Sequence, residues 1–239
     1  GYSTMEFYQE MQGRDPRLTQ TVRGPGYTRI GQTARLSPDF SCSTTGYQLT
    51  KWVTDVSQDG YNKSYNDIIL FRAAEVYLNF AEAKAERGTL TQDDINKSIK
   101  PIRDRVGMPN LDMKAANANP DPYLASNVTG YPNVSGENKG VILEIRRERT
   151  VELVMEPPYR SWDLFRWNEC KQALNHYRPY YGCYIAGAGT YDMDNDGTPD
   201  LELYIDEATS SCPTKLQIGK EVILSEETKG YIVGYPGVV

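Results

Sequence analysis

Histidine is almost missing from this chain of 239 residues, and its cysteines are widely spaced. His176 is the only histidine, which excludes a metal site built from several histidines. No cysteine pair has the C-x-x-C spacing of a zinc site. A chain of this length can bury a core without cross-links, so we expect buried free thiols, although disulfides in an oxidising compartment remain an alternative. The cysteines are Cys42, Cys170, Cys183 and Cys212.

Long apolar runs and basic clusters are missing as well. No stretch approaches the roughly 20 apolar residues that span a membrane, so an integral membrane segment is excluded. The net charge is -6 and no basic cluster offsets it, which argues against a nucleic-acid partner and leaves a neutral molecule or a protein. The chain begins Gly-Tyr-Ser without Met or a leader, and we expect a fragment that lacks its native start.

Two helices are predicted in the middle of the chain. The first covers residues 67–87 and is followed by the capping residue Gly88. The second covers residues 91–106, with Thr91 as N-cap and Pro101 as a possible kink or new turn. Together they form a hairpin of about 35 residues, close to the tetratricopeptide period. Such units stack in about three copies, so further helices are expected, either later in this chain or in a missing half. The core face of the first helix is formed by Ala74, Leu78, Ala81 and Ala85.

The remaining segments predict a mostly α fold. The expected fold has tetratricopeptide-like helical hairpins packed with a loop-rich region that contains a few short strands. We expect one region, with a helical core at 67–175 and loop-rich parts at 1–66 and 176–239. Its further elements are a short strand at 47–53, a long loop at 110–139, helices at 140–155 and 161–175, the second capped by Ser161, a strand at 201–205 and an irregular end at 215–239.

Residues 141–167 predict helices, and one helical face is apolar at its start and charged further along the sequence. Charge on a buried face must be paired, and Arg149 and Glu152 are neighbours on one helix. We therefore predict a desolvated network of ion pairs that joins two helices. Its expected members are Glu148, Arg149, Glu152, Glu156, Arg160, Asp163 and Arg166.

Glu148, Glu152 and Glu156 also suggest the acid and base of a glycosidase. Their spacing argues against this role, because residues four apart on one helix hold their carboxylates side by side. A glycosidase sets its two carboxylates about 5 to 9 Å apart across the scissile bond. Structural pairing with nearby arginines is the favoured interpretation.

The segment 191–201, YDMDNDGTPDL, is the strongest candidate for a metal site. Acidic side chains alternate along it, Gly197 permits a sharp turn, and oxygen ligands at this spacing bind Ca²⁺. An EF-hand needs an acid at the twelfth position, which is Leu203 here, so the loop is more similar to the D-x-D-x-D-G-x-x-D loops of FG-GAP repeats. The alternative is a turn that holds only water. The expected ligands are Asp192, Asp194, Asp196, the Thr198 carbonyl and Asp200.

Tyrosines in the predicted loops are candidates for binding sugar rings. A flat aromatic face buries the apolar face of a pyranose, while nearby polar groups bond to its hydroxyls. The alternative is that these tyrosines pack the loops onto the helical core. The three tryptophans Trp52, Trp162 and Trp167 are expected in the core. The candidate tyrosines are Tyr123, Tyr131, Tyr180, Tyr181, Tyr184 and Tyr191.

Five segments together resemble the C-terminal half of the SusD/RagB family of outer-membrane lipoproteins of Bacteroidota. The last of them departs from the family pattern E-R-x-x-E-L-x-x-E-G-x-R-x-x-D-L-x-R-W, because Pro157, Pro158 and Tyr159 follow Glu156 where the family has glycine and one further residue. In order, the segments are RDPRL at 14–18, TGYQLTKW at 45–52, ILFRAAEVYLNFAEAKAERG at 69–88, IRDRVGMP at 102–109 and ERTVELVMEPPYRSWDLFRW at 148–167.

The resemblance implies a surface protein that captures glycans or other nutrients. Members of the family are held at the outer membrane by a lipidated N-terminal cysteine and cap a TonB-dependent SusC-like transporter. Neither that cysteine nor the N-terminal repeats are recognised in this sequence. The resemblance gives the charged motif a structural, not a catalytic, role, and it transfers no sugar-contacting residue because these vary among members.

Three functions follow, in order of preference. The first is a non-catalytic cell-surface protein that binds a nutrient, in particular a glycan. The second is a tetratricopeptide-type adaptor that binds peptides, and the third is a calcium-dependent glycoside hydrolase. Neither the glycan nor the oligomeric state follows from the sequence.

Overall fold

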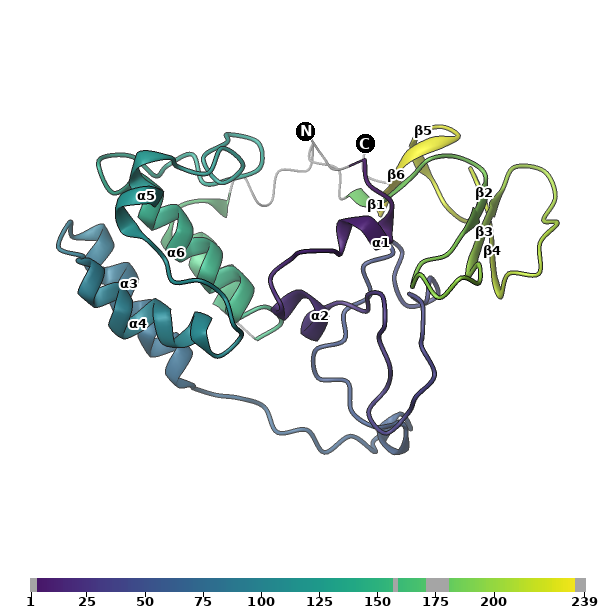
Figure 1. Cartoon of the computed structure of the whole chain (residues 1–239), viewed down its shortest axis with the longest axis horizontal. Coiled ribbons are helices and arrows are strands. Elements are labelled where there is room, and N and C mark those ends of the chain that lie inside the picture. The colour runs from purple at the N-terminus through teal and green to yellow at the C-terminus, as the bar shows by residue number, and fades with distance from the viewer. Residues whose placement is uncertain (1–3, 157–158, 171–180, 235–239) are drawn as a thin grey trace. The chain divides into compact units, whose positions relative to one another are not determined.

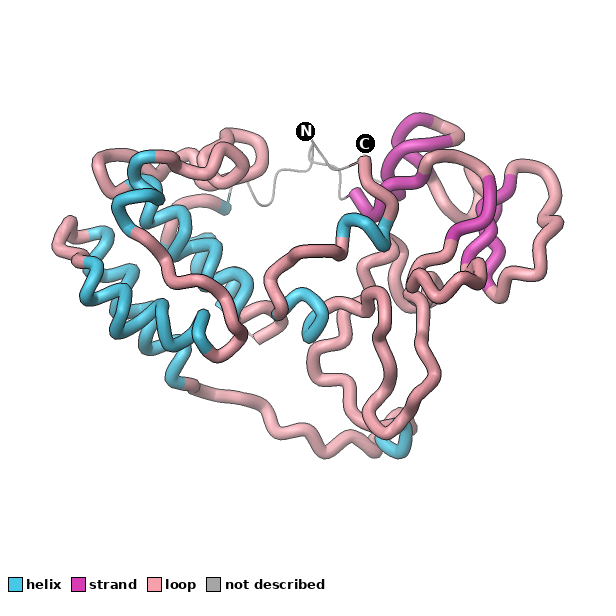
Figure 2. Tube along the Cα trace, in the orientation of Figure 1, coloured by secondary structure: helices cyan, strands magenta, loops and turns pink. Residues whose placement is uncertain are grey.

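The chain forms two compact units. The computed structural model describes residues 4–156, 159–170 and 181–234. One unit, Asp67–Asn175, is helical. The other combines Gly1–Asn66 with His176–Val239 and consists mainly of loops with short strands (Figure 1, Figure 2). The fold is therefore mostly α with a loop-rich region, as predicted.

The helical hairpin consists of α3, Ala73–Glu86, and α4, Gln92–Asp104. The two helices lie side by side in Figure 1 and pack against each other. Gly88 ends the first with a left-handed φ of 69°, which glycine adopts without strain. Thr91 caps the second in a capping box with Asp94, so both predicted caps are confirmed. Pro101 lies within α4, which continues to Asp104.

The start of α3 was predicted too early. Residues 67–72 are not helical, and Arg72 is the N-cap residue with an extended backbone. Its side chain bonds to Glu152 and Glu156. This long-range contact holds the segment outside the helix, and a local pattern does not reveal it.

Three further helices of this unit lie within the described residues. They are α5, Met113–Ala118, α6, Lys139–Glu152, and α7, Tyr159–Arg166. The first lies within the predicted loop 110–139, where Asp112 caps it by accepting from the Ala115 amide at 2.9 Å. Ser161 lies inside α7 and is not its cap. The helix ends at Arg166 and residues 167–169 are not helical, so the predicted helix to residue 175 is wrong at this point, where Asn168 has a left-handed φ of 55°. Residues 171–175 lie outside the described residues, as do Pro157, Pro158 and His176.

The core of the helical unit is formed by aliphatic side chains from α3, α4 and α6. Trp167 is buried beside them, as predicted, whereas Trp52 and Trp162 are exposed and are not core residues. No helix among the described residues has the length and apolar character needed to cross a membrane. The central core residues are Leu78, Ala81, Ala85, Ile95, Ile99, Ile102, Val141, Leu143 and Ile145.

The other unit contains two three-stranded sheets. The first has the order β1-β6-β5 and is antiparallel. The second has the order β2-β3-β4, with β2 antiparallel and β4 parallel to β3. The strands are β1, Tyr181–Ile185, β2, Gly189–Tyr191, β3, Leu201–Tyr204, β4, Thr214–Gln217, β5, Leu224–Glu226, and β6, Lys229–Val233. The short helices α1, Phe7–Glu10, and α2, Arg17–Thr21, and the 3-10 helix η1, Val56–Gln58, precede them.

The strand prediction is correct only for β3. The expected strand at 47–53 is reduced to an isolated bridge between Val22 and Leu49. The region expected to be irregular, 215–239, contains β5, β6 and most of β4. These strands are three to five residues long, too short for alternation to distinguish them from loops. A second core gathers on β1, β3 and β6, with Cys183, Ile185, Leu201, Leu203 and Ile232 among its most buried members.

The four cysteines are free thiols. Cys183 and Cys212 are buried as predicted, whereas Cys42 is exposed and Cys170 is half-buried. Burial raises the pKa of the Cys183 thiol to about 12. That thiol therefore stays protonated and unreactive at neutral pH.

The stability of the helical unit is expected to depend on pH through Asp94 in the first turn of α4. Hydrogen bonds from Lys84 and Thr91 lower the pKa of Asp94 from 3.8 to about 2. A lowered pKa adds stability that is present above pH 3.8 and is lost as the pH falls through about 2. We expect Asp94→Asn to be less stable than wild type at pH 6, with the difference closing towards pH 2. Urea unfolding of both proteins between pH 2 and 6 measures it, and a difference that does not change with pH would contradict this assignment.

Candidate functional site

The predicted charge network is built largely from partners distant in the sequence. Arg149 Nε lies 2.6 Å from Asp163 Oδ2, with both side chains 95% buried, and its Nη1 donates to Asn79 at 2.6 Å. The Asp163 carboxylate also accepts a hydrogen bond from the Arg166 guanidinium at 2.9 Å. These contacts join α3, α6 and α7, and they replace the predicted pairing of Arg149 with Glu152.

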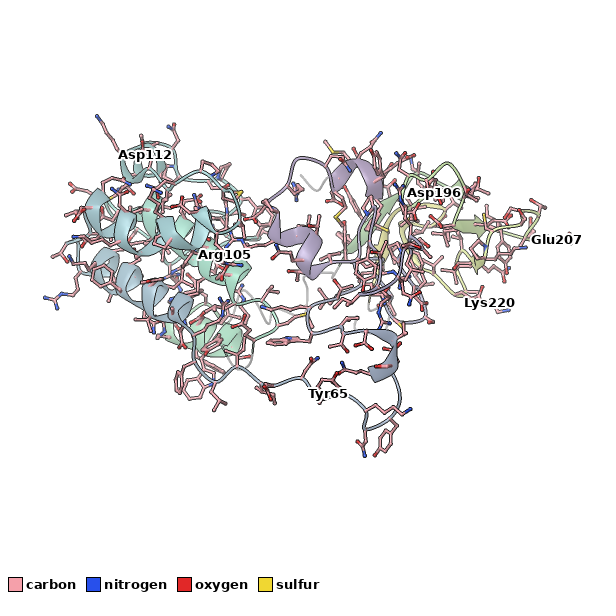
Figure 3. The ribbon with its side chains drawn as sticks, turned by 60° about the horizontal axis from the view of Figure 1, so that its bottom comes forward. Tyr65, Arg105, Asp112, Asp196, Glu207 and Lys220 are labelled. Atoms are coloured by element: carbon pink, nitrogen blue, oxygen red, sulfur yellow. The ribbon has the colours of Figure 1, made fainter. Side chains whose placement is uncertain are left out.

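The glutamates of α6 are paired with arginines that sequence reasoning missed. Arg72 lies 2.6 Å from Glu152 and 2.8 Å from Glu156. Arg105, at the end of α4 in Figure 3, reaches Glu152 at 2.8 Å. Arg103, on α4, forms an ion pair with Glu148 at 2.7 Å. The last two arginines lie in the segment IRDRVGMP, which was noted for its resemblance but not assigned to the network.

Arg160 does not belong to the network. It donates to the Tyr131 hydroxyl at 3.0 Å and to Thr150 at 3.1 Å. Glu82, which was not predicted, takes its place by binding Arg166 and the Trp167 indole nitrogen, the latter at 2.7 Å. Burial alone would raise the pKa of Glu82, but the hydrogen bonds from Arg166 and Trp167 hold it below its usual range.

The network leaves its glutamates unsuited to catalysis. Glu148, Glu152 and Glu156 are buried, and each lies within 2.8 Å of an arginine nitrogen. A general acid needs a proton to give, and a nucleophile needs access to the substrate. A carboxylate held against a guanidinium in the interior has neither.

Three tyrosines form a cluster on the sheet of β1 and β6, which we call the tyrosine platform. Tyr181 stacks on Tyr231 with ring centroids 5.1 Å apart and an interplanar angle of 26°. Tyr184 meets Tyr231 edge-on at 5.5 Å. All three side chains are half-buried, so each ring is anchored and still partly accessible. Burial raises the pKa of Tyr231, which keeps its hydroxyl protonated and able to donate.

A break in the strand register explains how the platform forms. Residues three apart in a regular strand point to opposite faces. The pairing of β1 with β6 shifts between Tyr181 and Tyr184, and a bulge of this kind redirects side chains. Both residues can therefore contact Tyr231, which pairs directly with Tyr184. Tyr231 was missed because it lies in a segment predicted to be irregular.

The backbone of β1 lies in close contact with the loop around Thr45. The Cys183 amide donates to the Thr45 carbonyl at 2.9 Å. A Cβ at Gly182 would lie 2.3 Å from that same carbonyl oxygen. Only glycine lets the loop around Thr45 approach the strand this closely.

Gly182→Ala is expected to push this loop away from β1. The overlap is with backbone, which cannot rotate aside, so we expect a loss of about 1.5 kcal/mol in the free energy of unfolding. Urea unfolding measures it, with Gly24→Ala as control, because the φ of Gly24 is not left-handed and its Cβ would meet only ordinary contacts at 3.8 Å or more. An unchanged midpoint for Gly182→Ala would show that the loop contact is not tight.

Of the other predicted tyrosines, those that the structure describes do not join this platform. Tyr131 is buried in the helical core, where it meets Trp167 edge-on at 5.5 Å and carries Arg146 and Arg160 against its ring. It is therefore a packing residue, contrary to the prediction. Tyr123 is exposed in the helical unit, and Tyr180 lies outside the described residues. Tyr191 exchanges hydrogen bonds with the backbone of Gly187, which fixes it locally.

The acidic loop, residues 192–200, connects β2 to β3. Carboxylate oxygens of Asp192, Asp194 and Asp200 lie within 4.8 Å of one another. Asp194 is only 4% exposed, and burial followed by the charges of Asp200, Asp196 and Asp192 raises its pKa. Among the described residues, no lysine or arginine forms an ion pair with this trio. The geometry and the negative charge suit a hard cation with oxygen ligands.

One expected ligand, Asp196, is placed differently. Asp196, labelled in Figure 3, accepts a hydrogen bond from the Thr198 amide at 2.8 Å and lies outside the trio. Gly197 has a φ of 92°, which fits the sharp turn that was predicted for it. The loop therefore brings together three of the four expected carboxylates, and the Thr198 carbonyl stays a predicted ligand.

Comparison with known proteins gives a family and two similar structures. A model described as the SusD family matches residues 1–206. A SusD-like carbohydrate binding protein, BF0978 of Bacteroides fragilis NCTC 9343, is 21% identical with a TM-score of 0.50, over 93% of this chain and 37% of its own. A structure named BT4246 is 28% identical with a TM-score of 0.46, over 67% of this chain and 27% of its own. A search of the curated proteins returned no match.

The likeness to BF0978 shows a shared fold, whereas the family match comes from the sequence. This chain spans about a quarter to somewhat more than a third of the length of these two structures. Ligands and partners of such longer proteins are not transferred by the fold alone.

Proposed function

This chain belongs to the SusD family, and on that premise we propose that it binds a neutral glycan without altering it. The observation that carries the proposal is the tyrosine platform of Tyr181, Tyr184 and Tyr231. Tyrosine rings bury the apolar face of a pyranose, and their hydroxyls bond to those of the sugar. The carbohydrate binding named for the B. fragilis relative supports the same ligand class.

The chemistry of the platform favours an uncharged ligand. Its members carry neutral hydroxyls and no fixed charge, and the whole chain has a net charge of -6. An acidic polysaccharide would meet repulsion at long range, whereas a neutral one would not. Aromatic faces also accept several sugars, because most pyranoses present an apolar patch of C–H groups.

Affinity electrophoresis tests this function. The chain is run through gels that contain a neutral α-glucan, β-glucan, mannan or galactan, and the same mixtures are assayed for new reducing ends. We expect at least one polysaccharide to slow the chain, with no reducing ends released. Release of reducing ends would support a glycoside hydrolase, and failure of all four to slow the chain would favour the peptide-binding adaptor.

We propose that the protein acts at the outer membrane of the cell. It would be held there by an N-terminal lipid anchor and would pass its glycan to a TonB-dependent SusC-like transporter. Membership of the family supports this arrangement. Purification from the native membrane in mild detergent tests it: the transporter should co-elute with the protein, and a protein that elutes alone would contradict it.

The acidic loop is proposed to bind Ca²⁺ through Asp192, Asp194 and Asp200. The support is their convergence within 4.8 Å and the burial of Asp194. A cation would offset the repulsion that raises the pKa of Asp194. Its role would be structural, since it would tie together the two ends of the loop between β2 and β3.

Calcium titration with a matched pair of variants tests the loop. We expect millimolar Ca²⁺ to release or absorb heat with wild type and to raise its melting temperature. Asp194→Asn should abolish both effects, and in calcium-free buffer it should be more stable than wild type because one repelling charge is gone. Asp196→Asn is the control and should still bind. No heat from wild type at millimolar Ca²⁺ would contradict the proposal.

A further inference from the structure

The bulge in β1 between Tyr181 and Tyr184 depends on a contact from outside its sheet. A bulge leaves a residue of the strand without its partner in the ladder, and a buried backbone amide must find another acceptor. Cys183, which lies in the bulge, is completely buried. Its amide donates to the Thr45 carbonyl at 2.9 Å. The segment around Thr45 therefore supplies the acceptor that the shifted register of β1 requires.

A glycine lets this segment lie directly on the bulge. Gly46 is buried and has a left-handed φ of 81°, which other residues adopt only with strain. A Cβ at this position would lie 2.8 Å from the sulfur of Cys183 and 3.6 Å from the ring of Phe40. The turn formed by Thr45, Gly46 and Tyr47 is thus packed tightly against β1 at the point where the register shifts.

Tyr47 anchors this turn to the helix α1. Its ring packs on Phe7, with the ring centroids 5.9 Å apart, and its hydroxyl donates to the carboxylate of Glu10. Burial, followed by the bond to Glu10, raises the pKa of Tyr47, so the hydroxyl keeps its proton and continues to donate at neutral pH. Phe7 is itself buried in the second core. The turn is therefore held from both sides, by α1 and by β1.

We propose that Tyr47 is a positioning residue of the tyrosine platform, because it holds the turn that keeps the bulge of β1 in place. The inference rests on the proposed glycan binding, since the platform serves a ligand only if its rings bind one. Tyr47 acts on the sugar through Tyr181 and Tyr184, without touching it.

Loss of this anchor is expected to lower the affinity for the glycan. Without Tyr47 the turn can move away from Cys183, and β1 can then pair with β6 in one continuous register. In that register Tyr181 and Tyr184 point to opposite faces of the sheet, so Tyr231 keeps only one of its two ring partners. The apparent affinity falls in proportion to the fraction of molecules that hold the bulge. A residue that served only stability would lower the melting temperature and leave the affinity of the folded chain unchanged.

Calorimetric titration at a temperature where every variant is folded measures this effect. The ligand is an oligosaccharide of the polysaccharide that most slows the chain. We expect Tyr47→Ala to bind it about tenfold more weakly than wild type. Tyr47→Phe keeps the ring on Phe7 but loses the bond to Glu10, and it should bind about threefold more weakly. Tyr27→Ala is the control and should bind as wild type does. Tyr27 is a half-buried tyrosine of the same unit, with the Arg23 guanidinium 5.6 Å from its ring centroid.

The rings themselves report on the bulge without any sugar. All 18 tyrosines are replaced by fluorotyrosine, and the fluorine NMR signals of Tyr184 and Tyr231 are assigned by their loss in Tyr184→Phe and Tyr231→Phe. We expect both signals to shift in Tyr47→Ala and to stay in place in Tyr27→Ala. Signals that do not move in Tyr47→Ala would show that the bulge forms without this anchor, which would overturn the proposal.

The titration separates this proposal from the proposed function. If wild type binds a glycan and both Tyr47→Ala and Tyr47→Phe bind it equally well, the role of Tyr47 alone is overturned. If wild type binds no glycan, the proposed function is overturned, and with it the role of Tyr47 in binding.

Discussion

Replacing Arg149 with alanine is expected to lower the free energy of unfolding by about 3 to 5 kcal/mol, the range for breaking one side of a buried pair. Arg149 and Asp163 are 95% buried and 2.6 Å apart. Removal of the guanidinium leaves a carboxylate in the interior with only Arg166, which is half exposed, to offset its charge. The bond to Asn79 on α3 is lost as well. Urea unfolding of wild type and variant measures the difference.

Two further variants separate this effect from a general loss of charge. Lys97→Ala removes an ion pair with Asp93 in which both side chains are more than two-thirds exposed, and it should cost less than about 1 kcal/mol. Arg149→Lys keeps the charge but loses the forked geometry, so its cost should lie between the other two. A loss below about 1 kcal/mol for Arg149→Ala would show that the network is a solvated surface.

Replacing Tyr231 with alanine is expected to weaken glycan binding about 30-fold, or about 2 kcal/mol, the size of a binding hot spot. Tyr231 lies between Tyr181 and Tyr184 and contacts both rings. The substitution therefore removes one stacking surface and frees the other two. Calorimetric titration with oligosaccharides of the polysaccharide that most slows the chain measures the affinity.

Tyr61→Ala is the control variant for the loss of glycan affinity in Tyr231→Ala. Tyr61 is 95% exposed and lies outside the platform, so its removal should leave affinity unchanged. The melting temperature of each variant shows whether β6 has stayed folded. Equal affinities for Tyr231→Ala and wild type would mean that the sugar binds elsewhere.

Local signals in the sequence predicted the helices better than the strands. Gly88 and Thr91 mark helix ends through backbone geometry and capping that are contained in a few residues. The start of α3 was missed because Arg72 is held by glutamates about 80 residues away. The strands β4 to β6 were missed because each is short and gains its stability from neighbours.

The charge network shows the same limit. Four of its acidic members were found because charge on an apolar stripe must be paired, and that rule needs only the sequence, whereas Glu82 was missed. Their partners were not found, because Arg72, Arg103 and Arg105 come from elements that only the fold brings together. Nearness in sequence suggested Glu152 for Arg149, and the structure gives Asp163 instead.

The tyrosine platform depends on a feature that no residue pattern contains. Tyr181 and Tyr184 were predicted as ligand residues for their type and setting, but their spacing of three argues against a shared face. The register shift between them makes a shared contact with Tyr231 possible. Bulges arise from the pairing of two strands, so this one could be recognised only once β6 was known.

A crystal structure of the chain soaked with an oligosaccharide that it binds would test the role of the tyrosine platform directly. We expect an intact sugar whose pyranose ring lies against Tyr181, Tyr184 or Tyr231. A sugar bound away from all three rings, or one found cleaved beside a pair of carboxylates, would contradict it.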